Sequence, residues 1–179
     1  GYGNQDPCAV TFIRMQLLGQ VLMAENLRDL LWTIDYLGSR SDVQAERLGC
    51  VGLSYGGRMT MLLAAVEPRV RVAVVSGALN VMQERISTHY SCGAQVIPGL
   101  LQYGDVPEIG SLIAPRPCLW EVGQQDKLID ARWAQIAIER MQRAYAAYEA
   151  SDSLRVASFD GGHRWSGVQA VPLLRKVLM

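Results

Sequence analysis

A serine between glycines is the residue of this chain best placed for nucleophilic chemistry. The sequence Gly52-Leu-Ser-Tyr-Gly56 follows a short apolar run, 48–53, and precedes a helical apolar pattern that stops at Pro68. A strand, a G-x-S-x-G turn and a helix in this order are typical of a nucleophile elbow, in which glycines allow the tight turn that exposes Ser54. The backbone N–H of Tyr55 would then point at a developing oxyanion. The alternative is a glycine-rich turn that exposes an ordinary serine.

Two further polar residues follow later strand-like runs. Asp126 comes shortly after the run 117–123, and His163 lies in a Gly-Gly turn after the run 154–159. Because the carboxyl ends of parallel strands share one edge of a sheet, we expect both side chains to meet Ser54 there. His163 would take the serine proton, and Asp126 would orient the imidazole and stabilise its charged form. The alternative for His163 is a surface histidine in a glycine-rich turn.

Two other carboxylates compete for the role of Asp126. Asp130 is expected to cap a helix that begins at Ala131, because aspartate is a preferred N-cap residue. Asp160 ends its strand three residues before His163. The order Ser, Asp, His along the chain favours Asp126 as the acid.

The elements that must position these residues alternate between strand and helix. Strands are predicted at 48–53, 70–76, 117–123 and 154–159, and helices at 9–38, after the elbow, at 131–150 and at 168–179. This alternation predicts a single α/β domain over residues 1–179, with a mainly parallel sheet covered by helices.

Residues 80–111 form the longest irregular region of the predicted domain. The region contains several glycines and prolines and follows the second strand at the catalytic end of the sheet. We expect it to line the substrate pocket, with His89, Tyr90 and Tyr103 as substrate-binding residues and Leu100 as an apolar contact.

The composition argues against polyanionic and membrane partners. The chain has 179 residues, of which 50% are hydrophobic, and Lys+Arg 17 balance Asp+Glu 17. Without net charge or a charged run, nucleic acid is not an expected partner. No apolar run approaches the roughly 20 residues of a membrane span. The two histidines lie far apart without clustered carboxylates or thiols, so we predict no metal site.

The cysteine pattern predicts no disulfide framework. Cys8, Cys50, Cys92 and Cys118 show no CxxC spacing, and the second and fourth lie in apolar strand-like runs, where thiols behave as small core residues. This pattern favours a reducing compartment such as the cytoplasm and otherwise leaves the location open.

Several motifs together resemble a known family. They are Gly52-Leu-Ser-Tyr-Gly-Gly57, Leu112-Ile-Ala-Pro-Arg-Pro117, Val122-Gly-Gln-Gln-Asp126, Phe159-Asp-Gly-Gly-His163 and the stretch 97–105. These segments resemble the matching parts of α/β-hydrolases of the dienelactone hydrolase and acetyl xylan esterase-like group. The resemblance implies a three-layer α/β-hydrolase fold, truncated to its C-terminal half with about four strands. It also implies a cofactor-independent serine esterase for small acyl esters such as acetylated sugars, with Ser54, Asp126 and His163 as its triad.

The sequence departs from this family at its N-terminal side. Family members carry further strands and a loop that usually supplies a second oxyanion donor, so here Tyr55 alone would remain. The strand 48–53 would lie at an open sheet edge, which we expect a second copy or another polypeptide to cover. Two functions follow: a serine carboxylesterase, or a catalytically weak or inactive hydrolase-fold module that acts in assembly or ligand binding.

Overall fold

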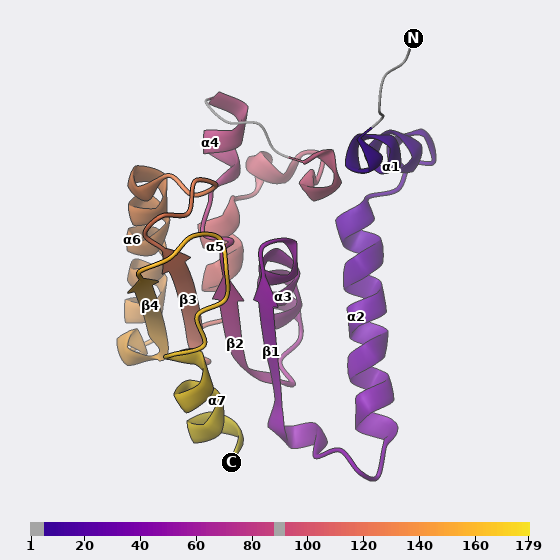
Figure 1. Cartoon of the computed structure of the whole chain (residues 1–179). Coiled ribbons are helices and arrows are strands. Elements are labelled where there is room, and N and C mark those ends of the chain that lie inside the picture. The colour runs from indigo at the N-terminus through magenta and orange to yellow at the C-terminus, as the bar shows by residue number, and fades with distance from the viewer. Residues whose placement is uncertain (1–5, 88–91) are drawn as a thin grey trace.

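A parallel four-stranded sheet organises the computed structural model, which describes residues 6–87 and 92–179 (Figure 1). The strands lie in chain order across the sheet: β1 (Leu48–Leu53), β2 (Val70–Ser76), β3 (Cys118–Gly123) and β4 (Leu154–Phe159). All neighbouring pairs are parallel, and β1 forms one edge of the sheet. The predicted parallel sheet of four strands is therefore confirmed.

Helices connect the strands and cover both faces of the sheet. They are α1 (Pro7–Leu17), α2 (Leu22–Ser39), α3 (Tyr55–Val66), α4 (Met82–Ser87), α5 (Val106–Ser111), α6 (Ala131–Ala147) and α7 (Ala170–Leu178). Short 3-10 turns lie at η1 (Ala45–Arg47), η2 (Gly93–Gln95), η3 (Leu100–Gln102) and η4 (Ser151–Ser153).

The core has two parts because strand side chains alternate between the faces of the sheet. Val75 and Trp120 face the larger cluster, which also contains residues of α2, α3 and α6. Val74 and Leu119 face the smaller cluster, where they pack with Leu173 of α7. Each fully buried large side chain contributes about 1.5–3 kcal/mol of hydrophobic free energy. The result is the predicted three-layer arrangement of helices, sheet and helix.

The N-terminal helical region differs from its prediction as one helix over 9–38. It consists of two helices, α1 and α2, bent by 89° at a break of four residues. Gly19 lies in that break with φ +67°, a left-handed conformation that glycine adopts without steric cost. In the described part of the chain, no single helix is long and apolar enough to cross a membrane, although this bent pair passes by length and composition.

The predicted irregular region 80–111 also contains helices. α4 begins two residues after Asn80, and the short turns η2 and η3 lead into α5. Asp105 starts α5 with a capping box, in which its side chain accepts from Val106 N and the Glu108 side chain accepts from Asp105 N. Short helices of six residues carry too little apolar periodicity to be recognised in sequence.

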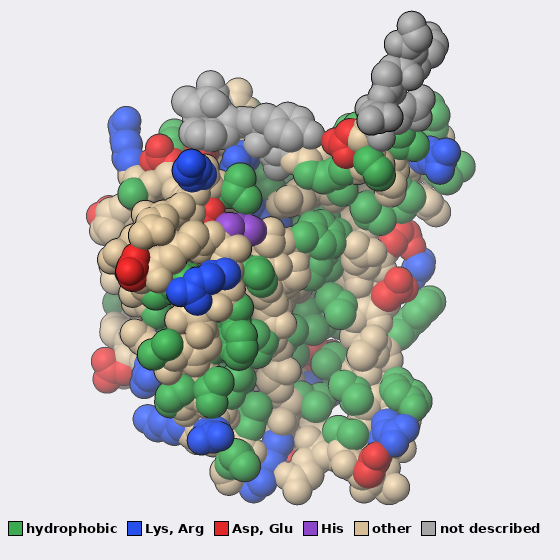
Figure 2. All heavy atoms as spheres, viewed as in Figure 1, with side chains coloured by type: hydrophobic (Ala, Val, Ile, Leu, Met, Phe, Trp, Pro, Cys, Tyr) green, Lys and Arg blue, Asp and Glu red, His purple; other side chains and the backbone are tan. Residues whose placement is uncertain are grey.

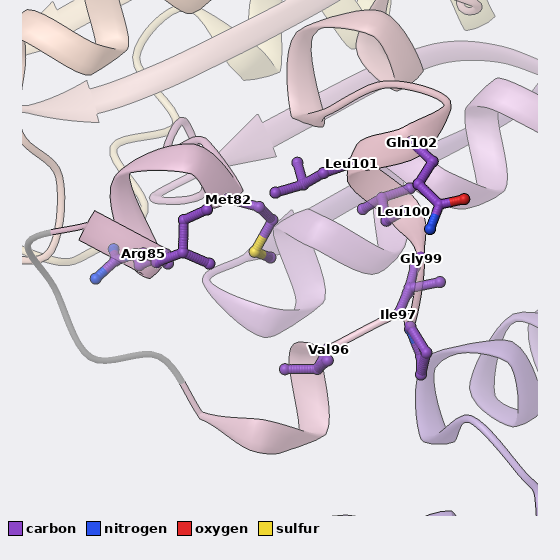
Figure 3. A pocket seen from close by; sticks show the side chains of 10 residues that line it. Met82, Arg85, Val96, Ile97, Gly99, Leu100, Leu101 and Gln102 are labelled. Atoms are coloured by element: carbon purple, nitrogen blue, oxygen red, sulfur yellow. The ribbon is translucent and has the colours of Figure 1, made fainter.

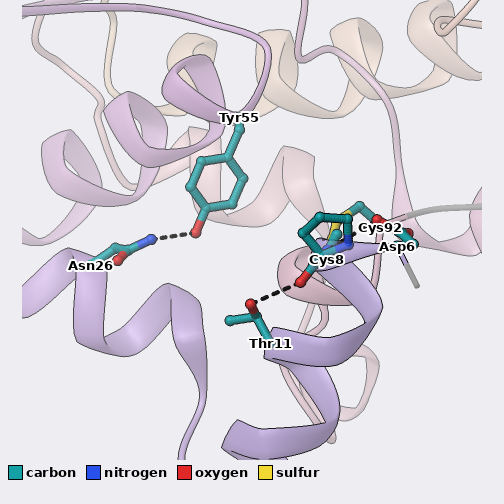
Figure 4. The surroundings of a disulfide bond; sticks show 7 residues. Asp6, Cys8, Thr11, Asn26, Tyr55 and Cys92 are labelled. Carbon is teal, nitrogen blue, oxygen red and sulfur yellow. Dashed lines mark hydrogen bonds between the residues drawn. A yellow bond between two sulfur atoms is a disulfide. The ribbon is translucent and has the colours of Figure 1, made fainter. Parts of the chain in front are cut away.

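A disulfide joins Cys8 of α1 to Cys92, which precedes η2 (Figure 4). The expectation of no disulfide is therefore wrong for this pair, whose Cα atoms lie 6.3 Å apart although 84 residues separate them in sequence. The argument for a reducing compartment loses its support, because it depended on the absence of a disulfide. The other two cysteines remain free thiols, and Cys118 is buried in the core as expected.

Candidate active site

Ser54 occupies a strained turn between β1 and α3. Its backbone has φ 60° and ψ −120°, values that non-glycine residues rarely adopt and that are common at functional sites. Ser54 N donates to the carbonyl of Ser76 at the end of β2 (2.8 Å), which fixes the turn against the sheet.

The glycines around Ser54 permit this close approach. A Cβ atom on Gly52 would collide with the carbonyl of Gly56, and one on Gly57 would lie 2.6 Å from the carbonyl of Ser76. By contrast, a Cβ on Gly56 would meet nothing within 4 Å. The steric requirement thus falls on Gly52 and Gly57, rather than equally on both glycines of the G-x-S-x-G motif.

Tyr55 begins α3, where the first backbone N–H groups of a helix lack intrahelical acceptors. These groups and the positive end of the helix dipole favour negative charge beside Ser54. The Tyr55 side chain is held separately, because its hydroxyl accepts a hydrogen bond from Asn26 Nδ2 of α2 at 2.6 Å (Figure 4). Burial of this ring raises the pKa of Tyr55.

Asp126 and His163 form a hydrogen-bonded pair. His163 Nδ1 lies 2.7 Å from Asp126 Oδ2, and the other carboxylate oxygen accepts from Leu128 N at 2.9 Å. The Asp126 side chain is 1% exposed, whereas that of His163 is 28% exposed. A carboxylate at Nδ1 favours the tautomer that is protonated there, and Nε2 is then free to accept a proton.

The loop that carries His163 is tied to the sheet by a buried carboxylate. Glu121 of β3 is 1% exposed and accepts from Ser166 N (3.3 Å) and Gly167 N (3.1 Å). On the other side of the loop, Gln125 Nε2 donates to Asp160 Oδ1 at 2.7 Å. His163 is therefore held between two anchored segments.

Ser54 and His163 line one cavity of about 220 Å³ at the carboxyl ends of the strands. A Cβ atom on Gly77 would lie 3.0 Å from the His163 ring, and Gly77 directly follows Ser76, which binds the Ser54 backbone. In the described residues, no hydrogen bond joins the Ser54 hydroxyl to His163. Catalytic hydrogen bonds are often long in unliganded enzymes and tighten when substrate binds.

The competing carboxylates take the structural roles expected of them. Asp130 is the N-cap of α6, and its side chain accepts from Arg132 N and Trp133 N. Asp160 follows β4 directly and accepts from Gln125. Of these carboxylates, Asp126 is the one bonded to His163.

Arg85 lines the cavity of Ser54 and also a second cavity beside it. This second cavity has a volume of about 570 Å³ and is shown in Figure 3. Its other walls are mainly apolar and come from α4 and the segment 96–102, including Leu100 and Ile97. The predicted substrate residue Tyr103 is 89% exposed and lines neither cavity. The other two, His89 and Tyr90, lie outside the described residues.

Arg58 and Asn80 line the cavity of Ser54 and His163 although the motifs do not single them out. Arg58 stands one helical turn after Ser54 and is 4% exposed. Its one visible signal in the sequence is a lone charged residue within the apolar helix that follows the elbow. Asn80 is placed by the loop after β2, whose path the local sequence does not reveal.

The described residues offer no group of three or more His, Cys, Asp or Glu side chains arranged to hold a metal ion. The parallel sheet, the strained serine turn and the Asp–His pair beyond the following strands are the arrangement of the α/β-hydrolase fold.

Comparisons with known proteins agree with this class. Residues 20–91 match the model of the prolyl oligopeptidase family. The chain is 34% identical over 188 residues to YtaP of Bacillus subtilis (strain 168), which carries the name of a hydrolase. The alignment covers 99% of this chain and 62% of YtaP, so the chain spans less than two thirds of that relative.

Two solved structures show the same fold. A structure titled as an acetyl xylan esterase from Bacteroides fragilis NCTC 9343 superposes with a TM-score of 0.73 at 16% identity, over 98% of this chain and 48% of the other. One titled as a dienelactone hydrolase from Klebsiella pneumoniae subsp. pneumoniae MGH 78578 has a TM-score of 0.54 at 24% identity, over 79% of this chain and 50% of the other. The chain has the α/β-hydrolase fold, and its resemblance to this group is confirmed at the level of the fold.

Proposed function

We propose that this chain forms the catalytic half of a serine carboxylesterase that hydrolyses small acyl esters, acetyl esters among them. The observation that carries the proposal is the 2.7 Å contact between His163 Nδ1 and Asp126 Oδ2, at a cavity that Ser54 also lines. The names of the relatives, which include hydrolases and esterases, support the same reaction class.

The first half of the reaction forms an acyl-enzyme. Ser54 Oγ attacks the ester carbonyl carbon while His163 Nε2 takes the hydroxyl proton, and Asp126 stabilises the resulting imidazolium. The carbonyl oxygen becomes an oxyanion beside the N–H of Tyr55 and the start of α3. As the C–O bond to the alcohol breaks, His163 returns its proton to the departing oxygen.

The second half regenerates the enzyme. His163 takes a proton from water, whose oxygen attacks the acyl carbon, and the tetrahedral intermediate collapses when the bond to Ser54 Oγ breaks. His163 returns the proton to Ser54, and the carboxylic acid leaves. In each half, Nε2 first accepts a proton and then returns it, and Nε2 is the nitrogen left free by the Asp126 contact.

An alternative function is a catalytically weak or inactive module that acts in assembly or ligand binding. It is favoured by the lack of a Ser54–His163 hydrogen bond among the described residues and by the expectation that Tyr55 supplies the one backbone oxyanion donor. Losing one oxyanion donor costs roughly 10²–10³ in turnover.

Hydrolysis of 4-nitrophenyl acetate distinguishes these functions. We expect native protein to turn over this ester, and Ser54→Ala to lose about 10³-fold or more in kcat/KM, because the attacking oxygen is absent. Ser41→Ala is the matched control, since Ser41 is exposed and remote from the cavity. A folded native protein that is no faster than Ser54→Ala would contradict the esterase proposal and favour the alternative.

A further inference from the structure

The cavity beside Ser54 contains a buried arginine that lacks one of its hydrogen-bond acceptors. Arg58 Nη2 donates to the carbonyl of Asn80 (3.3 Å) and also to its side-chain Oδ1. Arg58 Nε is buried and has no hydrogen-bond partner. A buried donor without an acceptor destabilises the folded protein. An acceptor brought by a ligand would remove this cost.

The charge of Arg58 also lacks a direct counterion. In the described part of the chain, Arg58 makes no ion pair within 4 Å. Asp105 lies close enough to raise the pKa of Arg58, but its oxygens accept from the backbone N–H groups of Met82, Gln83 and Val106. Asp105 therefore stabilises the charged form of Arg58 without an ion pair, and the guanidinium remains available to an anion.

A second guanidinium increases the positive charge at the same wall. Arg85 lines the cavity, and its Nη2 donates to the carbonyl of Leu128. Burial lowers the pKa of Arg58 to about 10, Asp105 opposes this shift, and Arg85 adds to it by repulsion. Arg58 thus stays charged at neutral pH. A bound anion would offset the desolvation of this buried charge and its repulsion by Arg85.

Asn80 adds a directed donor. Because its Oδ1 faces Arg58, its Nδ2 group remains as the donor of this cavity-lining side chain. No described residue accepts a hydrogen bond from Asn80 Nδ2. A carboxylate, with two oxygens and several lone pairs, can accept from Arg58 and Asn80 together.

We propose that this cavity binds a carboxylate carried by the acyl part of the substrate, so that the preferred esters are half-esters of short dicarboxylic acids. The inference rests on the proposed esterase function. The acyl group stays bonded to Ser54 Oγ in the acyl-enzyme, and the cavity of about 220 Å³ that contains Ser54 also contains Arg58. The adjoining apolar cavity of about 570 Å³ suits the leaving alcohol.

Two esters with one leaving group test the proposal kinetically. Phenyl hydrogen glutarate carries the carboxylate, and phenyl pentanoate is its neutral analogue of equal chain length. We expect native kcat/KM to favour the glutarate ester by about 10- to 100-fold, the range of a charge-assisted hydrogen bond. Arg58→Met should bring this ratio close to one, Arg58→Lys should give an intermediate ratio, and Arg143→Met, an exposed control, should keep the native ratio.

Glutarate binding tests the site without catalysis. Glutarate should raise the melting temperature of native protein and Arg143→Met, whereas neutral glutaramide should not, and Arg58→Lys should respond weakly. If no ester is hydrolysed but glutarate binds through Arg58, the proposed function fails and the anion site stands. If esters are hydrolysed with equal or better use of phenyl pentanoate, or if glutarate does not bind native protein, the carboxylate site is overturned. Both native-protein readouts remain decisive if Arg58→Met does not fold.

Discussion

At the scale of single residues, Asp126 and two neighbouring aspartates have different hydrogen-bond partners. Asp126 contacts His163 Nδ1, while Asp130 caps α6 and Asp160 binds Gln125. Three aspartates near one loop thus differ in role because each reaches a different partner. In the proposed reaction, proton transfer depends on the carboxylate that fixes the imidazole tautomer.

Replacing Asp126 by asparagine should inactivate the enzyme while preserving its shape. The amide cannot stabilise the imidazolium and favours the wrong tautomer, so we expect kcat for 4-nitrophenyl acetate to fall by about 10³- to 10⁴-fold. Asp160→Asn is the matched control and should retain most of the activity. If the two variants lose activity equally, or if Asp126→Asn stays within a few-fold of native protein, the assignment of Asp126 is wrong.

The sequence predicts residues well where their role follows from their place after a strand. Ser54, Asp126 and His163 were each predicted from this rule, and the structure brings Asp126 to His163 and His163 to the cavity of Ser54. Arg58 and Asn80 cannot be found in this way, because their roles depend on burial and on the path of a loop. Tyr103 shows the reverse case, an aromatic residue in the expected region whose side chain points to solvent.

At the scale of elements, α3 is supported at both ends. Its N-terminus carries Ser54, and its C-terminus is bound by Arg116 from the Ile-Ala-Pro-Arg-Pro motif. Arg116 Nη1 donates to the carbonyls of Glu67 (3.1 Å) and Val70 (2.7 Å), and Nη2 donates to that of Ala64 (2.5 Å). A cation here satisfies carbonyls that the helix leaves unpaired and complements the helix dipole.

Arg116→Ala should therefore destabilise the whole domain. Loss of these charge-assisted hydrogen bonds is expected to cost about 2 kcal/mol, which for a chain of this size corresponds to a fall of roughly 4–8 °C in Tm. The measurement is thermal unfolding followed by circular dichroism, with exposed Arg143→Ala as the control. A Tm equal to that of the control would show that the cap does not stabilise α3.

Most strand boundaries in the structure agree with the boundaries predicted from the sequence. β1, β2 and β4 have the predicted bounds, whereas β3 begins at Cys118 because Pro117 has no N–H to donate to the sheet. The helix predicted at 131–150 ends at Ala147, and the final helix spans Ala170–Leu178 within the predicted 168–179. The division between α1 and α2 was missed, because apolar residues recur across Gly19 and conceal the bend.

At the scale of the whole molecule, β1 pairs with β2 on one side, and among the described residues its other edge has no partner strand. Val51 and Leu53 of β1 are 43% and 37% exposed, and Trp32 of α2 is 60% exposed. Hydrophobic side chains gather along the strip between β1 and α2 in Figure 2. Such an edge can pair with another chain and is rarely left uncovered in native proteins.

We propose that a second copy or another polypeptide covers this edge. Size-exclusion chromatography with light scattering should show the isolated chain as a dimer or larger species. Val51→Lys should shift it toward monomer, because a charged residue on an edge opposes pairing. Val168→Lys, on an exposed loop, should have no such effect. A stable native monomer over a wide concentration range would contradict the proposal.

Long-range contacts were the least predictable feature at this scale. The open edge was expected from the resemblance to the hydrolase group, and the strand order confirms that β1 is an edge strand. The Cys8–Cys92 disulfide depends on how α1 folds back over η2, which no local spacing encodes. Because Cys92 also lines the cavity of Ser54, this bond ties the N-terminal helix to the wall of that cavity.

The central claim is that Ser54 is a nucleophile activated through His163 and Asp126. Labelling with a fluorophosphonate tests it most directly, because the serine oxygen displaces fluoride from phosphorus and leaves a stable adduct. Tandem mass spectrometry should locate one adduct on Ser54 in native protein, none there in Ser54→Ala, and much slower labelling in Asp126→Asn. A folded native protein that stays unlabelled, or that carries its adduct on another residue, would contradict the claim.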